Sequence, residues 1–268
     1  MTWRPGPAWL FCPADRPDRW AKAAAVADVV IVDLEDAVAP AGKAAARDAV
    51  RAGGFDPERT VLRINAAGTP DHDADLALLA GTPLRRVMLA KAEDPAALAA
   101  LDAFEVLALV ESPLGVERVG ELAAVAHVVG VMWGADDLVA GLGGLSSRHA
   151  DGRYRDVARH ARSRALVAAK AHGRLAIDAV HMDIADVEGL RAECEDAVAV
   201  GFDATVAIHP SQVEVIRGAY RPDDERVAWA GRLLEAVGDD RGVTTFEGRM
   251  VDGPIFRQAE RVLRLAGR

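Results

Sequence analysis

Three carboxylates lie directly after two apolar runs in the middle of the chain. Glu111 follows the run at 107–110, and Asp136 and Asp137 follow the run at 128–133. Mg2+ takes one or two protein carboxylates and completes its octahedron with water and substrate oxygens. A carboxylate after a strand also caps the next helix or faces solvent. The choice between a metal site and these structural roles depends on how the two runs are arranged.

The segment between the two runs predicts that arrangement. Apolar residues recur at roughly helical spacing between 114 and 126. Strand, helix and strand over about 30 residues form a βαβ unit, and its two strands must run parallel. Parallel strands end at the same edge of a sheet. Glu111 and Asp137 are therefore expected to be neighbours although 26 positions separate them (137 − 111).

The whole chain alternates between strand-like and helix-like segments. We expect strands at 9–12, 28–34, 60–65, 85–90, 107–112, 128–133, 175–180 and 205–209. Eight βα repeats with few hairpin signals favour the α/β class and a (β/α)8 TIM barrel. An open doubly wound sheet is the alternative. It is disfavoured because no Gly-x-Gly-x-x-Gly follows the first strand and no phosphate-loop Gly-Lys-Ser/Thr occurs.

The pattern changes near residue 221. We expect a helix at 222–237, a turn at 239–242 and a last helix at 258–265. The expected organisation is a barrel catalytic domain of residues 1–220 and a C-terminal helical extension of residues 221–268. The extension is a candidate lid, oligomer arm or helix packed on the outside of the barrel.

Composition excludes several classes of protein. The chain has 268 residues, 51% of them hydrophobic, and a net charge of −9. An acidic chain disfavours nucleic acid as a partner, because that partner needs a basic face. We expect no signal peptide, because the N-terminus lacks a long apolar run, and no membrane span, because no apolar run approaches 18 residues. Cys12 and Cys194 are expected to be buried thiols in a reducing cytoplasm.

Polar residues follow most of the expected strands. In a (β/α)8 barrel the active site lies at the carboxyl ends of the strands. The set there is acidic with two cations, which predicts a metal site with an anion clamp. An arginine can hold a carboxylate through two parallel hydrogen bonds. The members of the set are Glu35, Asp36, Arg63, Asn65, Lys91, Glu111, Asp136, Asp137, Asp178 and His209.

Other chemistries fit this set less well. A serine hydrolase is disfavoured because no Gly-x-Ser-x-Gly occurs, and zinc is disfavoured because no histidine or cysteine cluster occurs. Lys91 raises the alternative of a Schiff-base aldolase. Beside Glu93 and a metal its amine is expected to stay protonated, which disfavours that role. His209 is more often a structural residue of the rim than a base.

Ordered motifs recur along the whole chain. They are Phe11-Cys-Pro13, Asp33-Leu-Glu-Asp-Ala-Val38 with Lys43 and Arg47, Arg63-Ile-Asn65, Val110-Glu-Ser-Pro113, Trp133-Gly-Ala-Asp-Asp-Leu138, Gly201-Phe202, Ile208-His-Pro-Ser-Gln212 and Phe246-Glu-Gly-x-Met-Val-Asp252. Together these motifs resemble those of the citrate lyase β-subunit-like proteins of the HpcH/HpaI aldolase group, a family of pyruvate-binding barrels. The resemblance runs essentially from end to end.

The resemblance implies a Mg2+-dependent carbon–carbon lyase of the Claisen type that acts on CoA thioesters. Stand-alone members of the group cleave β-hydroxyacyl-CoA substrates such as citramalyl-CoA, malyl-CoA or 3-hydroxy-3-methylglutaryl-CoA. The products are acetyl-CoA and a keto acid. The Met-Val-Asp segment favours this group over the subunit that works inside the citrate lyase complex. The physiological thioester and the direction of the reaction stay open.

The resemblance also assigns roles to residues. Glu111 and Asp137 match the metal ligands, and Arg63 matches the arginine that binds the substrate carboxylate. Glu35 and Asp36 match an acidic pair that orders metal-bound waters. A further position depends on the resemblance alone. It implies that Asp252 is a catalytic acid/base on a C-terminal lid, which closes over a neighbouring subunit of a homotrimer.

The phosphates of CoA need cations at the rim of the barrel. Arg16, Arg19 and Lys22 follow the first strand and are candidates. A solvated helix face is the alternative for these three. Two other functions are also open: a class II pyruvate aldolase acting on free hydroxy-keto acids, and a non-catalytic subunit of the citrate lyase type.

Overall fold

Eight parallel strands form a closed barrel in the computed structural model, which describes residues 3, 5–238 and 241–267. Neighbouring strands pair in chain order, and β1 pairs with β8 to close the barrel. This confirms the predicted (β/α)8 barrel and excludes the open sheet. The strands are β1 (Ala8–Pro13), β2 (Val29–Asp33), β3 (Thr60–Ile64), β4 (Arg86–Leu89), β5 (Glu105–Val110), β6 (Val128–Trp133), β7 (Leu175–Asp178) and β8 (Ala204–Ala207).

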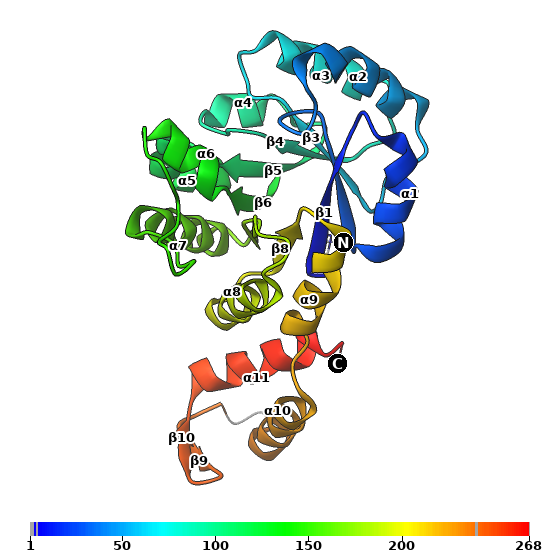
Figure 1. Cartoon of the computed structure of the whole chain (residues 1–268). Helices are drawn as coiled ribbons and strands as arrows, with labels where there is room; N and C mark the ends of the chain where they lie inside the picture. Colours follow the sequence, from blue (N-terminus) through cyan, green and yellow to red (C-terminus); the bar gives the residue numbers. More distant parts are fainter. Residues whose placement is uncertain (1–2, 4, 239–240, 268) are drawn as a thin grey trace. The chain divides into compact units, whose positions relative to one another are not determined.

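Helices follow the strands and lie on the outside of the barrel (Figure 1). Several begin with a proline in the first turn after a capping side chain. Thr69 and Ser112, for example, each accept a hydrogen bond from a backbone N–H of the helix that follows. The helices of this part are α1 (Pro17–Val26), α2 (Lys43–Ala52) with the short 3-10 turn η1 (Pro40–Gly42), α3 (Pro70–Leu79), α4 (Pro95–Ala99), α5 (Pro113–Ala124), α6 (Ala135–Gly141), α7 (Asp156–Ala171), α8 (Val187–Val200) and α9 (Pro210–Tyr220).

The strands are buried on both faces, which explains their continuous apolar runs. Ile31 belongs to the cluster that contains Leu107, Met132 and Val206, whereas its neighbour Val32 is buried outside that cluster. Hydrophobic burial at about 25 cal/mol per Å² is the main term that stabilises such a core. The core fixes the strand ends, and the strand ends carry the polar residues.

The pairing of β5 with β6 brings the central carboxylates together. Val110 pairs with Trp133, and the backbone N–H of Gly134 donates to the carbonyl oxygen of Val110 at 3.1 Å. Glu111 therefore lies beside the residues that begin α6. The βαβ unit predicted from the sequence is confirmed.

The chain divides into two compact units, Met1–Ile216 and Arg217–Arg268. The second unit contains α10 (Asp224–Val237), the antiparallel hairpin of β9 (Thr244–Phe246) and β10 (Arg249–Val251), and α11 (Gly253–Leu265). Its own core includes Leu233, Val251 and Phe256.

The second unit differs from the sequence prediction in two ways. The hairpin was not predicted; Glu247 and Gly248 form its turn with φ values of 47° and 76°, the positive values that tight hairpin turns require. The last helix begins at Gly253, not near residue 258. The predicted turn at 239–242 lies partly outside the described residues. In the described part of the chain, no helix combines the length and apolar character needed to cross a membrane.

Candidate active site

A cavity of about 360 Å³ opens at the carboxyl ends of the strands. Five of the sequence-predicted residues line it: Asp36, Arg63, Glu111, Asp136 and Asp137. The rest of its lining is mainly apolar, and the apolar side chains are Phe11, Ala37, Leu109, Met132, Trp133, Ala135, Val180, Met182 and Ile208. The cavity therefore joins a group of charged side chains to an apolar surface. A small ligand with a carboxylate at one end and carbon substituents elsewhere fits this combination.

Glu111 is the most perturbed carboxyl group of the cavity. Its residue is only 4% exposed, and its Oε1 accepts a hydrogen bond from the backbone N–H of Lys91 at 3.1 Å. Burial raises the pKa of Glu111 to about 8; the charge of Arg63 opposes this rise and the charge of Asp137 adds to it. A carboxylate removed from water to this extent is ionised at neutral pH only when a further cation compensates it.

Gly134 leaves the space that the Glu111 side chain occupies. A Cβ added at Gly134 would lie 2.8 Å from both the Cβ and the Oε2 of Glu111. The φ of Gly134 is −126°, which any residue adopts, so this position needs glycine for space and not for backbone conformation. The absence of a side chain at Gly134 therefore lets the Glu111 side chain pack against the start of α6.

Arg63 is already bound at one edge of its guanidinium group. Its Nε and Nη2 donate to the two oxygens of Asp33 at 2.7 and 2.6 Å, and its Nη1 lies 3.2 Å from Glu35 Oε2. The guanidinium also stacks on Phe11, with its Cζ 4.6 Å from the ring centroid. The expected bidentate grip on a substrate cannot use the Nε edge, because Asp33 occupies it. A substrate carboxylate can bind only to the remaining Nη atoms.

Lys91 joins the acidic residues of the rim. Its Nζ forms an ion pair with Glu35 and lies 3.1 Å from Asp36 Oδ2 and 3.5 Å from Asp137 Oδ1. Burial lowers the pKa of Lys91, but the hydrogen bond to Glu35 and the surrounding carboxylates outweigh it and hold the pKa above its usual value. A protonated amine is not a nucleophile, so this environment opposes a Schiff base. The sequence suggested Glu93 as the acidic neighbour of Lys91, but the partners in the structure are Glu35, Asp36 and Asp137.

The residues present fit a single Mg2+ ion better than a metal held entirely by protein. Among the described residues, no group of three or more His, Cys, Asp or Glu side chains is arranged to hold a metal ion. Mg2+ needs only one or two carboxylates, because water and substrate oxygens complete its shell. Glu111 and Asp137 line the same cavity, and the charge of Asp137 raises the pKa of Glu111. Within the described part of the chain no ion pair of Glu111 with a basic side chain is formed, and the guanidinium of Arg63 is bound to Asp33.

The sequence reasoning missed the residues that support this site. Lys43 is buried, and its Nζ donates to the carbonyl oxygens of Leu34 and Glu35 at 2.8 and 3.0 Å and to Asn65 Oδ1 at 2.6 Å. Asp75 accepts from the backbone N–H and the Nδ2 of Asn65 at 2.9 and 2.7 Å. These bonds fix the backbone that presents Glu35. The motif Asp-Leu-Glu-Asp followed by Lys43 indicates that Lys43 is important, but it does not predict which residues Lys43 binds.

Replacing Gly134 by alanine is expected to damage metal binding without unfolding the barrel. The new Cβ would displace the Glu111 carboxylate, since the two cannot remain 2.8 Å apart. We expect the Mg2+ concentration for half-maximal activity to rise at least tenfold, and the free energy of unfolding to fall by about 1–3 kcal/mol. Titration of activity with Mg2+ and urea unfolding measure these changes.

The matched control for this prediction is Gly120→Ala. Gly120 lies in α5, and a Cβ added there meets no atom within 4 Å. Its substitution should leave the Mg2+ dependence unchanged and stabilise the helix by about 1 kcal/mol or less. Equal effects of the two substitutions on Mg2+ dependence would contradict the role given to Gly134.

Asp33→Asn is expected to destabilise the protein by about 3 kcal/mol, because it removes the bidentate charged partner of the buried Arg63 guanidinium and leaves only the Nη1 contact with Glu35. Urea unfolding measures the loss. Asp48→Asn is the control, because Asp48 pairs with Arg51 on the surface, where a pair contributes about 0–1 kcal/mol. A loss below about 1 kcal/mol for Asp33→Asn would contradict the importance of the buried pair.

Comparison with known proteins shows the family to which the chain belongs. The model of the family described as HpcH/HpaI aldolase/citrate lyase matches residues 8–210. The chain belongs to this family. It is 61% identical over 262 residues to the "Citrate lyase subunit beta-like protein" of Mycobacterium tuberculosis, covering 98% of this chain and 96% of that protein. The likeness runs from end to end, as the motifs had predicted.

Two further relatives of the family are informative. A crystal structure of the M. tuberculosis protein CitE in complex with magnesium, acetoacetate and coenzyme A superposes with a TM-score of 0.94 at 61% identity, covering 98% of this chain and 99% of that chain. The L-malyl-CoA/β-methylmalyl-CoA lyase of Cereibacter sphaeroides is 32% identical over 304 residues, with 98% and 95% covered. The first structure shares the closed barrel.

The three candidate contacts for the phosphates of CoA lie outside the cavity lining. Arg16, Arg19 and Lys22 are exposed at the start and along the first half of α1, and Arg16 pairs with Asp18 at 3.2 Å. Within the second unit, Asp252 is half-buried at the N-terminus of α11 and makes no capping hydrogen bond with its side chain.

The side chain of His209 makes its hydrogen bonds with Ser211, two positions further along the chain. It is exposed and does not line the cavity. Its Nδ1 lies 2.8 Å from Ser211 Oγ and accepts from the backbone N–H of Ser211 at 3.2 Å.

Asp178, another residue of the predicted rim, is bound to other side chains and does not line the reaction cavity. It accepts a hydrogen bond from Trp133 Nε1 at 2.6 Å and forms an ion pair with Arg162.

Proposed function

We propose that this chain is a Mg2+-dependent carbon–carbon lyase that cleaves a β-hydroxyacyl-CoA thioester to acetyl-CoA and a keto acid. One observation carries the proposal: a buried carboxyl, Glu111, shares a cavity at the carboxyl ends of the strands with Asp137 and Arg63. The relatives support the substrate class, since one structure contains magnesium and coenzyme A and another relative is a malyl-CoA lyase.

Glu111 and Asp137 hold the metal in this proposal. When bound, Mg2+ acts as a Lewis acid that polarises the substrate oxygens and neutralises the charge that develops on them. The N–H groups of the two Arg63 Nη atoms that do not face Asp33 bind the substrate carboxylate. Glu35 and Asp36, held by Lys91, orient the waters that complete the site.

The reaction needs two proton transfers: the β-hydroxyl group loses a proton, and the α-carbon of the thioester gains one. The β-hydroxyl group loses its proton to an ordered water, and the oxygen–carbon bond becomes the carbonyl of the keto acid. The adjacent carbon–carbon bond breaks, and its electron pair passes to the thioester fragment as an enolate. Asp252 then protonates the α-carbon to give acetyl-CoA. In the condensation direction Asp252 removes the same proton.

Several features of the whole assembly belong to the same proposal. Residues 221–268 form a lid, and Asp252 acts on the site of a neighbouring subunit in a homotrimer. Arg16, Arg19 and Lys22 bind the phosphates of CoA. The protein works in the cytoplasm. A variant with the lid removed should keep Mg2+ binding and lose cleavage, because its barrel retains Glu111 and Asp137.

The deciding experiment is an assay of the purified protein with Mg2+ and a panel of β-hydroxyacyl-CoA thioesters. Acetyl-CoA and keto acid are measured, with EDTA as the control. Metal-dependent cleavage would support the lyase and rank its substrates. Turnover of free hydroxy-keto acids alone would favour a class II pyruvate aldolase. No turnover of either class would favour a non-catalytic subunit of the citrate lyase type.

A further inference from the structure

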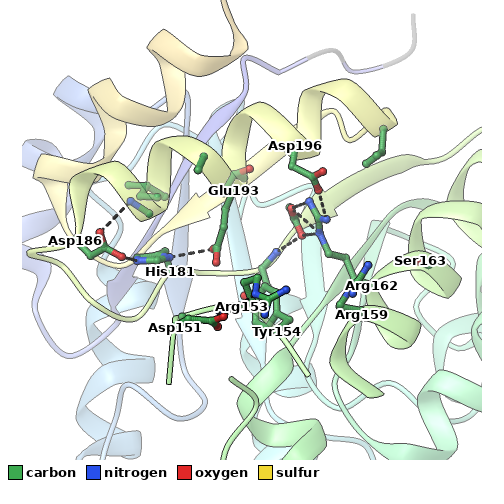
Figure 2. A pocket seen from close by; sticks show the side chains of 18 residues that line it. Asp151, Arg153, Tyr154, Arg159, Arg162, Ser163, His181, Asp186, Glu193 and Asp196 are labelled. Carbon is green, nitrogen blue, oxygen red and sulfur yellow. Dashed lines mark hydrogen bonds and ion pairs between the residues drawn. The ribbon is translucent and has the colours of Figure 1, made fainter. Parts of the chain in front are cut away.

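The segment after β7 separates the reaction cavity from a second cavity. The second cavity, of about 610 Å³, is lined by residues of α7, α8 and the loop at 151–154 (Figure 2). Val180 and Met182 line the reaction cavity, whereas Ala179 and His181 line the second one. Successive side chains therefore face opposite sides of the segment. A group that holds His181 in place therefore also holds Val180 and Met182 in place at the reaction cavity.

His181 anchors the segment from within the second cavity. The residue is 5% exposed, and its Nδ1 lies 3.0 Å from Glu193 Oε2. Arg148 holds the same Glu193 through two hydrogen bonds, which fixes the carboxylate. Figure 2 shows His181 between Glu193 and Asp186. Its Nε2 is buried 3.3 Å from Asp186 Oδ2, but poorly aligned for a hydrogen bond.

Gln212 ties this segment to the one after β8. Gln212 is 2% exposed, and its Nε2 donates to the carbonyl oxygen of His181 at 2.8 Å. Its Oε1 accepts from the backbone N–H groups of Ile208 and His209 at 2.9 and 3.2 Å. One buried amide therefore satisfies three backbone groups in two loops. Removing it would take away the side-chain partner of all three groups.

The two loops that Gln212 joins supply an apolar wall to the reaction cavity. We define the apolar wall as Val180, Met182 and Ile208, which all line that cavity. Met182 is 57% exposed, so little except its backbone holds it in place. The charged residues of the cavity take the carboxylate and oxygens of a substrate. The carbon substituent of the hydroxyl-bearing carbon is left to contact the apolar wall.

We propose that Gln212 and His181 are positioning residues that set the apolar wall and thereby select the alkyl substituent on the hydroxyl-bearing carbon of the substrate. This inference rests on the proposed lyase function. Neither residue touches the reacting atoms in it. Both act through the backbone of the two loops, and the Ile-His-Pro-Ser-Gln motif gains a role that the reaction itself did not give it.

The test compares two thioesters that differ by one methyl group at the hydroxyl-bearing carbon, malyl-CoA and citramalyl-CoA. A methyl group in a shaped apolar pocket changes kcat/KM by about 10–200-fold. We expect Gln212→Met, which loses all three hydrogen bonds, to change the ratio of the two kcat/KM values by at least about tenfold. Gln212→Glu keeps the acceptor for Ile208 and His209 and should change the ratio less.

A merely structural role predicts a different result. Both kcat/KM values would then fall by the same factor, and a ratio unchanged within about twofold would overturn the proposal. Met182→Ala alters the wall directly and shows how large a change in the ratio the wall can produce. If Gln212→Met does not fold, Gln212→Glu and His181→Asn, which keeps a side-chain N–H to face Glu193, carry the test.

Failure of the lyase function itself would be seen separately. If the wild-type protein cleaves neither thioester, the proposed function fails and the wall is tested by binding. Pyruvate and glyoxylate also differ by one methyl group, and calorimetry in the presence of Mg2+ gives their Kd values. A ratio of these Kd values that differs at least fivefold between wild type and Gln212→Met would support the wall. An equal ratio would overturn it.

Discussion

Glu111→Gln is expected to lower Mg2+-dependent cleavage of a β-hydroxyacyl-CoA by at least about 1,000-fold while the barrel stays folded. Glutamine has the shape of glutamic acid but no charge, so it fits the buried position and cannot serve as an anionic ligand. A metal ion contributes several kcal/mol of charge stabilisation to such a reaction, and each 1.36 kcal/mol is about tenfold in rate. Steady-state kinetics with saturating thioester and varied Mg2+ measure the effect.

The control for Glu111→Gln is the same chemical change at an exposed glutamate. Glu117 is exposed on α5, and Glu117→Gln should leave kcat and the Mg2+ dependence within about twofold of wild type, as surface substitutions usually do. Circular dichroism and urea unfolding show whether each variant is folded. A folded Glu111→Gln protein with more than about a tenth of wild-type activity would overturn the metal assignment.

The barrel was predictable because its strands are buried on both faces. Such strands appear in a sequence as continuous apolar runs, and all eight runs were identified before the pairing was known. The carboxylates of the site followed from the same reasoning, since each comes directly after a run. Only the parallel arrangement of neighbouring strands was needed to place Glu111 near Asp137.

The partners of the charged side chains were not predictable in the same way. Lys91 pairs with Glu35, which lies 56 positions earlier in the chain (91 − 35), and not with the adjacent Glu93. Asp33 takes the Nε edge of the Arg63 guanidinium, which leaves only the Nη1–Nη2 edge for a substrate. These choices depend on the register between β2, β3 and β4. A sequence gives the ends of strands to within a few residues but gives no register.

The hairpin of β9 and β10 was missed for a related reason. Each strand has only three residues, which is too short for an alternating pattern to stand out. The Glu247-Gly248 pair is the one local signal, because glycine readily takes the positive φ of a tight turn. The role proposed for Asp252 could not be predicted from the residues at all, because it depends on the resemblance to the family and has no local signal in the sequence.

The second large effect is a pH dependence of metal binding. Mg2+ affinity is expected to fall by up to tenfold for each pH unit below about 8, because the proton and the metal compete for Glu111, whose pKa is raised to about 8 mainly by burial. Near pH 7 the binding of one Mg2+ should release about one proton, and above pH 9 it should release almost none. Calorimetry in two buffers with different ionisation enthalpies measures both quantities.

The metal-free protein should show the opposite trend in stability. The folded Glu111 holds its proton to about pH 8, whereas the ordinary pKa is 4.5. The folded state therefore binds more protons between these values, and stability falls as the pH rises through this window. At pH 7 the loss is about 3 kcal/mol, from 1.36 kcal/mol per pH unit. Urea unfolding in EDTA at pH 5 and pH 7 measures it.

Glu111→Gln links these two measurements. It should abolish the proton release, and it should make the metal-free protein more stable than wild type at pH 7 but not at pH 5, because protonated glutamic acid and glutamine are nearly equivalent when buried. A variant that loses activity but shows the wild-type pH dependence of stability would place the perturbed carboxyl elsewhere. In that case Glu111 would not be the group that lowers the stability of the metal-free protein at pH 7. The charge that Mg2+ compensates would then belong to another carboxylate.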